Sequence, residues 1–135
     1  MIAFSCQVSA SNMNTPTRSY RDLIVWQKAI DLVADIYKVT DRFPDREKYA
    51  LSSQMRRAAV SIPSNIAEGR SRGTRKDFVN FLHTALGSGT ELETQLIIAQ
   101  RLNYLQSANF QSTTALLSEV CRMLHAMIKK LEAGS

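Results

Sequence analysis

The sequence predicts an all-α fold, an antiparallel up-down-up-down four-helix bundle with a proline-kinked second helix. Along residues 22–131, apolar residues recur at alternating spacings of three and four, which is the period of one helix face. The 135 residues include only five Gly and three Pro, too few for the many turns of a β-sandwich or barrel. This length favours one domain with one core. We expect a flexible tail over residues 1–19 and the bundle over residues 20–133.

The first predicted helix covers residues 22–40. It ends before Phe43 because Pro44 disfavours helical backbone at the residue that precedes it, and Asp45 can cap the segment that follows. The apolar spacing predicts one core-facing stripe, formed by Leu23, Trp26, Ile30, Val33 and Tyr37.

The second predicted helix begins near Asp45. Pro63 lies inside its pattern, where a proline removes one backbone donor and clashes with the carbonyl four residues back, at Ala59. We expect a kink there, because the apolar stripe continues beyond it. Gly69 and Gly73 are expected as signals for the end of the helix. The stripe consists of Leu51, Met55, Ala58, Ile62 and Ile66.

Two further helices follow a predicted cap at Thr74, with Asp77 in the place of the usual Glu or Gln of a capping box. Gly87 and Gly89, in the middle of the third helix, favour the close approach of another helix. A loop over residues 103–108 separates the two helices. The third stripe is Phe78, Phe81, Ala85, Ser88, Leu92, Gln95, Ala99 and Leu102, and the fourth is Phe110, Leu117, Val120 or Cys121, Leu124, Ile128 and Leu131.

The positive charge is concentrated in one third of the chain. The formal net charge is +5, yet residues 42–76 alone hold nine basic and three acidic residues, which gives +6 for that segment. Such a local positive field attracts polyanions, although a solvated helix face would look the same. Aromatic residues are sparsely interleaved here, so base stacking is not indicated. The predicted nucleic-acid contacts are Arg56, Arg57, Arg70, Arg72, Arg75 and Lys76.

Catalytic and metal-binding patterns are missing from the sequence. Neither His83 nor His125 follows a Glu at the spacing of di-iron bundles, and no phosphate-binding loop or nucleophile elbow is present. We therefore expect no enzyme activity, no cofactor and no metal. Cys6 and Cys121 lie far apart with no CxxC pattern, which fits a reducing cytoplasm. No apolar run is long enough to span a membrane, and the N-terminus lacks the pattern of a secretory signal.

A group of polar residues interrupts the apolar pattern around Pro63. Ser61, Asn65 and Glu68 fall on one stripe of the second helix, and the third helix offers polar residues beside its glycines. We interpret the group as a structural network that satisfies backbone groups near Pro63, with Glu68 paired to Arg72. A catalytic role for Glu68 is less favoured because no base or nucleophile accompanies it. The predicted network is Ser61, Asn65, Glu68, Ser88 and Glu91.

Three segments resemble the four helix bundle protein family, also called the 23S rRNA intervening-sequence protein family. They are the opening run at residues 20–29, the Ser-Ile-Pro-Ser-Asn-Ile-Ala-Glu-Gly run at 61–69, and the residues from Phe81 to Glu93. Gly89 departs from the family pattern, which has a larger apolar residue there. The resemblance implies a four-helix bundle in a ring-like homopentamer. It also implies kinship with the accessory variability protein of diversity-generating retroelements, a basic pentamer that binds a reverse transcriptase and its template RNA.

Together these observations favour a non-enzymatic, oligomeric, cytoplasmic scaffold that binds structured nucleic acid, RNA in first place. Backbone-directed binding fits the arginine-rich segment better than sequence readout does. The reverse transcriptase of a diversity-generating retroelement is a further implied partner. The alternative is a protein-protein interaction module of the same family with no nucleic-acid role.

Overall fold

Four long helices make up the bundle. The computed structural model describes residues 19–134, so Cys6 and the predicted tail, apart from Ser19, lie outside the described residues. The helices are α2 (Ile24–Thr40), α3 (Leu51–Ser71), α4 (Arg75–Arg101) and α5 (Ser107–Ala133), with short 3-10 helices η1 (Tyr20–Asp22) and η2 (Asp45–Glu47). No strand occurs within residues 19–134. The predicted all-α, four-helix fold is confirmed.

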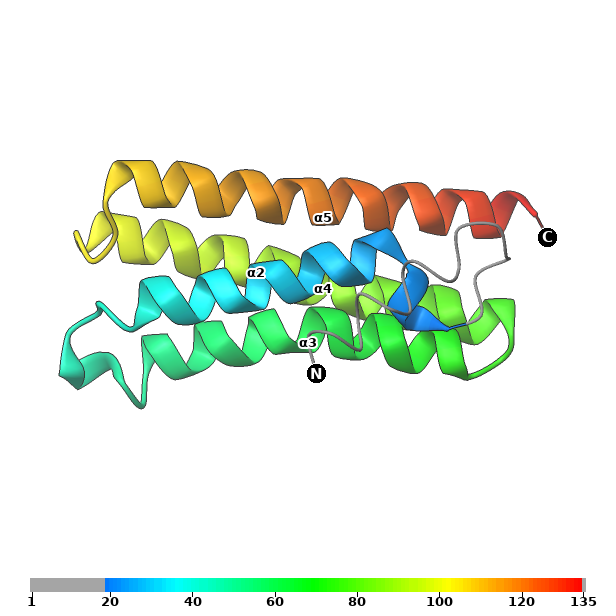
Figure 1. Ribbon diagram of the computed structural model, residues 1–135, viewed down its shortest axis with the longest axis horizontal. Coiled ribbons are helices and arrows are strands. Elements are labelled where there is room, and N and C mark those ends of the chain that lie inside the picture. Colours follow the sequence, from blue (N-terminus) through cyan, green and yellow to red (C-terminus); the bar gives the residue numbers. More distant parts are fainter. Residues whose placement is uncertain (1–18, 135) are drawn as a thin grey trace.

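The helices pack in a closed cycle around one core. Helix α2 packs against α3 and α5, and α4 packs against the same two neighbours. Along the chain, each helix runs back beside the one before it (Figure 1). Because α2 and α4 share the neighbours α3 and α5, they lie diagonally across the core. In the part of the chain that the structure describes, no helix has the length and apolar content needed to cross a membrane.

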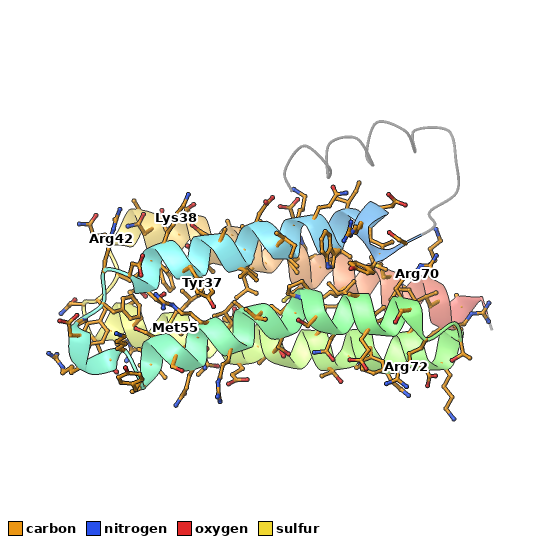
Figure 2. The ribbon with its side chains drawn as sticks, turned by 60° about the horizontal axis from the view of Figure 1, so that its bottom comes forward. Tyr37, Lys38, Arg42, Met55, Arg70 and Arg72 are labelled. Atoms are coloured by element: carbon orange, nitrogen blue, oxygen red, sulfur yellow. The ribbon has the colours of Figure 1, made fainter. Side chains whose placement is uncertain are left out.

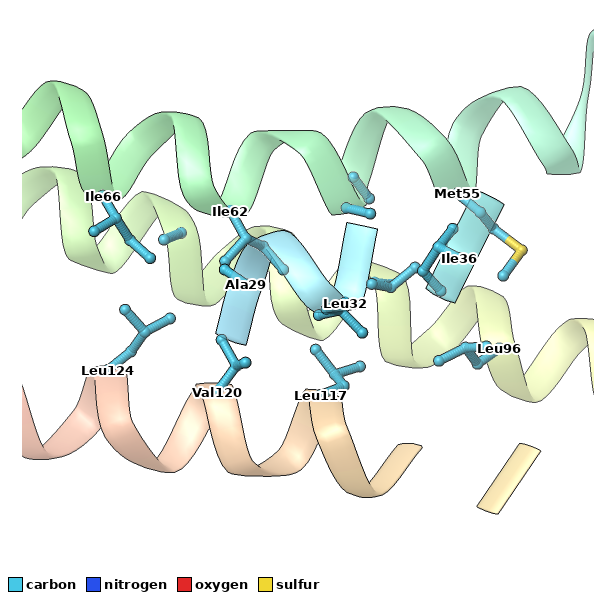
Figure 3. Close-up of a cluster of buried hydrophobic side chains, with 14 of the residues drawn as sticks. Ala29, Leu32, Ile36, Met55, Ile62, Ile66, Leu96, Leu117, Val120 and Leu124 are labelled. Carbon is cyan, nitrogen blue, oxygen red and sulfur yellow. The ribbon is translucent and has the colours of Figure 1, made fainter. Parts of the chain in front are cut away.

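Side chains from all four helices interdigitate in this core (Figure 3). The stripes predicted for α3 and α5 are largely confirmed, because these helices bury most of the residues expected of them. Helix α4 buries half of its predicted stripe, and three further residues of that stripe are half-buried. In α5 it is Val120, fully buried, and not Cys121 that faces the core. Leu102 is the main departure in α4, since it is 49% exposed at the end of the helix. The buried members of the three stripes are Met55, Ala58, Ile62, Ile66, Ala85, Leu92, Gln95, Ala99, Leu117, Val120, Leu124 and Ile128.

The stripe predicted for α2 is wrong by one position. Helix α2 has apolar residues on two adjacent stripes, and spacing alone does not show which one faces inward. The inner stripe buries small and branched side chains that fit between α3 and α5, whereas Ile30 and Tyr37 of the predicted stripe are 41% and 44% exposed. Leu23, Trp26 and Val33 are half-buried at the edge of the core. The inner stripe is Val25, Ala29, Leu32, Ile36 and Val39.

The second long helix begins at Leu51, six positions after the predicted start at Asp45. The turn η2 and residues 48–50 interrupt it, and Ala50 has the non-helical angles φ −124° and ψ −107°. Glu47 fixes this break. One carboxylate oxygen accepts a hydrogen bond from the Leu51 amide at 3.3 Å, and the other accepts from the Tyr104 hydroxyl at 2.8 Å. The side chain therefore caps α3 and joins its start to the α4–α5 turn.

Other predicted boundaries are confirmed. Thr74 caps α4, since its hydroxyl accepts from the Asp77 amide at 3.2 Å. Gly73 has a φ of +89°, the left-handed conformation that follows many helix ends and that favours glycine. Helix α3 continues through Pro63 from Leu51 to Ser71. The kink at Pro63 stays a prediction.

Two glycines allow close helix contacts. A Cβ added at Gly69 would lie 2.6 Å from the Cβ of Phe81, so α3 and α4 approach closely at that point. A Cβ at Gly89 would lie 2.8 Å from the Sγ of Cys121 on α5. The close approach expected in the middle of α4 thus occurs at Gly89, whereas Gly87 has nothing within 4 Å of its added Cβ. Gly69, expected as an end signal, serves instead as a packing residue inside α3.

We predict opposite effects for Gly69→Ala and Gly87→Ala. Alanine at Gly69 meets a Cβ that moves only with the backbone of α4, so overpacking should cost about 1–3 kcal/mol of unfolding free energy. Gly87→Ala adds a methyl in open space and should stabilise by about 0.5–1 kcal/mol, because glycine is a poor residue inside a helix. Urea unfolding followed by circular dichroism measures both. Equal effects of the two substitutions would contradict the close α3–α4 contact.

A matched pair on α2 tests which stripe faces the core. Ile36 is fully buried and Ile30 is 41% exposed. Ile36→Ala should cost about 2–5 kcal/mol of unfolding free energy, as other large-to-small core substitutions do. Ile30→Ala should cost less than half as much. A larger loss for Ile30→Ala, measured in the same urea titrations, would restore the stripe that spacing alone predicts.

Candidate nucleic-acid interface

The predicted nucleic-acid contacts fall into two groups at opposite ends of α3. Arg56 and Arg57 lie near its start, and Arg70 and Arg72 lie at its end, about 20 Å away at 1.5 Å per residue. Figure 2 shows Arg42 and Tyr37 toward one end of the bundle and Arg70 and Arg72 at the other. The sequence-based prediction joined the two groups because they are close along the chain. A single bound phosphate could not contact both.

The first group lies in a groove between the end of α2 and the start of α3, here called the Tyr49 groove. Tyr49 is 88% exposed and Tyr37 is 44% exposed, which is unusual for such large rings. The ammonium of Lys48 lies 5.6 Å from the centre of the Tyr49 ring. No Asp or Glu is among the lining residues. They are Tyr37, Lys48, Tyr49, Ser53, Arg56, Arg57, Val60 and Ser61.

Arg56 is fixed by its neighbours on α2. Its Nε donates to the Thr40 hydroxyl at 2.9 Å and its Nη2 contacts the Asp41 carboxylate at 2.9 Å. The guanidinium also lies over the Tyr37 ring, 4.6 Å from its centre. The Thr40 hydroxyl in turn donates a hydrogen bond to the Ile36 carbonyl at 2.7 Å. Arg56 therefore joins α2 to α3 and orients Tyr37, while the exposed Arg57 has no ion-pair partner within residues 19–134.

The second group, the α3–α4 corner, consists of Arg70, Arg72, Arg75 and Lys76. Arg70 is partly buried. Arg72 contacts the Glu68 carboxylate at 2.9 Å and lies over the Phe81 ring at 5.1 Å. Arg75 and Lys76 are exposed in the first turn of α4 and line a shallow pocket that also includes Glu132. This corner thus offers two cations outside the ion pairs of the described residues.

The predicted polar network is divided into three parts. Ser61 and Ser88 join α3 to α4 through hydroxyls 2.7 Å apart. Asn65 donates to the Ser61 carbonyl and hydroxyl at 2.8 and 2.9 Å, so its amide nitrogen bonds to Ser61 and not to the carbonyl at Ala59. Glu68 pairs with Arg72 at the surface, as expected. Glu91 accepts from the side-chain amide of the buried Gln95 at 3.2 Å.

The residues that could support metal or nucleophilic chemistry are dispersed. Among residues 19–134, no group of three or more His, Cys, Asp or Glu could hold a metal ion. His83 and His125 are exposed on the helices. Burial beside Gly89, and to a lesser degree the Glu93 carboxylate, raise the pKa of the Cys121 thiol. This thiol is therefore held in its protonated, weakly nucleophilic form at neutral pH.

Next to the Tyr49 groove lies an apolar groove, which the sequence did not reveal as surface. It is the outer stripe of α2 together with the facing side of α3. Trp26 packs edge-on against Tyr20, with 5.2 Å between ring centres, and both rings line the groove. No charged residue takes part. The lining residues are Tyr20, Trp26, Ile30, Val33, Val60, Pro63, Ser64 and Ala67, and Val60 also lines the Tyr49 groove.

Comparison with known proteins identifies the family. The family described as 23S rRNA-intervening sequence protein matches residues 21–126. Six chains of solved structures match as well. One is a crystal structure from Bacteroides thetaiotaomicron VPI-5482, described as a protein with unknown function from the S23 ribosomal protein family. It is 27% identical, with a TM-score of 0.73, and the alignment covers 78% of this chain and 96% of that chain. A search of curated proteins finds no match.

The matched residues run from Arg21, within η1, to Ala126, seven residues before the end of α5. They include both basic groups and most of the core and of the apolar groove, whereas Tyr20 and Ile128 lie outside the match. The likeness in fold spans nearly the whole of the solved chain. This chain belongs to the 23S rRNA-intervening sequence protein family.

Proposed function

We propose that the protein is a non-enzymatic, oligomeric scaffold that binds structured RNA through exposed cations at the two ends of α3. The observation that carries the proposal is that Arg57, Arg75 and Lys76 are exposed and outside the ion pairs of residues 19–134. Unpaired cations of this kind release counterions from a phosphate backbone. The description of the family, which refers to an intervening sequence of 23S rRNA, supports RNA over DNA.

The spacing of the two basic groups favours a folded polyanion. About 20 Å separates them along α3, so one short loop of RNA would meet only one group. A double-helical or otherwise structured RNA could contact both, and repetition of the groups in an oligomer would enlarge the basic surface. Neither group presents a constellation for base readout in a groove. Binding by shape and phosphate contacts is therefore the mode that we propose.

Charge reversal at the α3–α4 corner tests RNA binding. Arg75→Glu combined with Lys76→Glu should weaken binding of an RNA hairpin by about 10-fold or more at moderate salt. It should also reduce the slope of log K against log salt by about 2, one for each lost phosphate contact. Fluorescence anisotropy across a salt series measures both quantities. The matched control reverses Arg101 and Arg122, two exposed cations on α4 and α5 that lie away from this corner.

The control should have the smaller effect, because the same net charge change is made away from α3. If the two double variants weaken RNA binding equally, the affinity depends on the total charge of the protein and not on the α3–α4 corner. No binding of the unaltered protein at low salt would refute the RNA proposal. The protein-interaction module, whose partner would contact the exposed helix faces, would then take its place.

The apolar groove supports the proposed oligomer. Ile30 and Val60 leave 41% and 39% of their surface exposed, and the groove between them has no charged lining residue. Such a surface favours an apolar partner. A closed ring uses two different surfaces on each subunit, because its contacts are head-to-tail. Ile98 and Leu102 on α4, 43% and 49% exposed and four residues apart, form a candidate for the second surface.

The apolar groove lies over α2 and α3 and the second surface lies on α4, so the two are different parts of the subunit, as head-to-tail contacts require. The resemblance found in the sequence implies five subunits, and each further subunit would add one Tyr49 groove and one α3–α4 corner. A reverse transcriptase as an additional protein partner also stays a prediction of that resemblance.

Mixing two variants tests the ring. Ile30→Glu alters the groove and Ile98→Glu alters the α4 surface, so each variant alone should be a monomer of 15.1 kDa by light scattering. An equimolar mixture should form dimers, because each pair retains one intact contact. The unaltered protein should have several times the mass of one chain. Monomeric unaltered protein would contradict the ring, and a mixture that stays monomeric would contradict the pairing of these two surfaces.

A further inference from the structure

The Tyr49 groove combines exposed aromatic rings with unpaired cations. Its volume of about 590 Å³ lies within the range of ligand sites. Tyr49 lies between η2 and α3, in the break that Glu47 produces, and is 88% exposed. Its ring has a cation at 5.6 Å, from Lys48, and little other protein around it. An aromatic ring held in water in this way is available for stacking.

Tyr37, on α2, also lines the groove. Arg56, fixed by Thr40 and Asp41, lies over the Tyr37 ring and so limits its movement. The two tyrosines are twelve positions apart in the sequence, and only the turn between α2 and α3 brings them to one groove. In the linear pattern only Tyr49 of these two aromatic residues lies within the basic segment 42–76. The folded chain places two of them beside Lys48 and Arg57.

The charges around the groove complement a phosphodiester chain. Lys48, Arg56 and Arg57 line it, and no carboxylate does. Asp41 and Glu47, which lie between α2 and α3 in the chain, are already engaged, since Asp41 pairs with Arg56 and Glu47 accepts from Tyr104 and Leu51. Lys48 and Arg57 therefore remain for a ligand. Rings for bases and cations for phosphates are the two components of a single-strand binding site.

We propose that the Tyr49 groove binds an unpaired segment of RNA, with a base stacked on Tyr49 and its flanking phosphates on Lys48 and Arg57. The proposal rests on the proposed RNA-binding function. It adds a preference for unpaired RNA, which the basic groups alone do not distinguish from paired RNA. The bound RNA would be a structured molecule with a single-stranded stretch or loop. An acidic protein segment would satisfy the cations but would leave the exposed ring with no flat partner.

Anisotropy with two labelled probes, a 12-nucleotide oligouridine and an RNA duplex of equal length, tests this assignment. Tyr49→Ala should weaken oligouridine binding by about 5- to 100-fold, the range measured for loss of one stacked base. Duplex binding should change by less than about 2-fold. Tyr49→Phe should bind both probes as the unaltered protein does, because the ring is retained. Circular dichroism should show that Tyr49→Ala folds normally, since the side chain is mostly in solvent.

Arg57→Gln measures the phosphate contact. It should weaken oligouridine binding and reduce the salt slope by about 0.7, the value for one contact to a single strand. The matched control is Arg122→Gln on α5. Arg122 is exposed, and its Nη1 donates to the Ser118 hydroxyl at 3.0 Å, one turn away on the same helix. It should leave the slope unchanged.

Each adverse outcome has a distinct meaning. If Tyr49→Ala binds oligouridine as well as the unaltered protein does, or loses affinity equally for both probes, the groove is not a stacking site. If an oligoglutamate of equal charge displaces oligouridine as well as unlabelled oligouridine does, the groove selects charge alone, which also refutes the proposal. In both cases RNA binding by the basic groups would stand. Failure of the unaltered protein to bind either probe would refute the two proposals together.

Discussion

Helix α2 is apolar over a wider arc than one four-helix core can cover. Its inner stripe, with Leu32 and Ile36 fully buried, closes the bundle against α3 and α5. Its outer stripe, from Trp26 through Ile30 and Val33, then has to lie at the surface, because the two stripes are adjacent on one helix. The outer stripe forms one wall of the apolar groove and leads directly into the Tyr49 groove at the end of the helix.

All four helices could be predicted from the sequence, but the face that α2 turns toward the core could not. In α3 and α5 spacing and burial agree, whereas in α4 half of the predicted stripe is buried beside Leu82 and Leu96, which that stripe did not include. In α2 the larger side chains, Trp26 and Tyr37, lie on the outer stripe, whereas the inner stripe uses the small Ala29. Size and spacing therefore favoured the wrong face. The start of α3 was missed because its cap is the side chain of Glu47, which precedes the helix and also accepts from the distant Tyr104.

The basic residues of the candidate site could be predicted from the sequence, but their contacts in the folded chain could not. Charge counting found the basic residues, yet it could not show that Arg56 is engaged by Asp41 across the α2–α3 turn or that Arg72 pairs within its own helix. Nor could it bring Tyr37 beside Tyr49. These relations depend on contacts between helices, which a linear pattern does not contain. The structure thus shows ion pairs for Arg56 and Arg72 and two tyrosines in the groove that Arg56 and Arg57 line, while the six nucleic-acid contacts stay predictions.

The most direct measurement of whether the outer stripe of α2 is covered uses Trp26, the single tryptophan of the chain. Its ring lines the apolar groove, so acrylamide quenching of its fluorescence reports access to that groove. The comparison is between the unaltered protein and Ile98→Glu, which alters only the diagonal helix α4. If a second copy fills the groove, quenching is weak in the unaltered protein and stronger in Ile98→Glu. Equal quenching in the two proteins would contradict the proposal that a second copy covers this stripe.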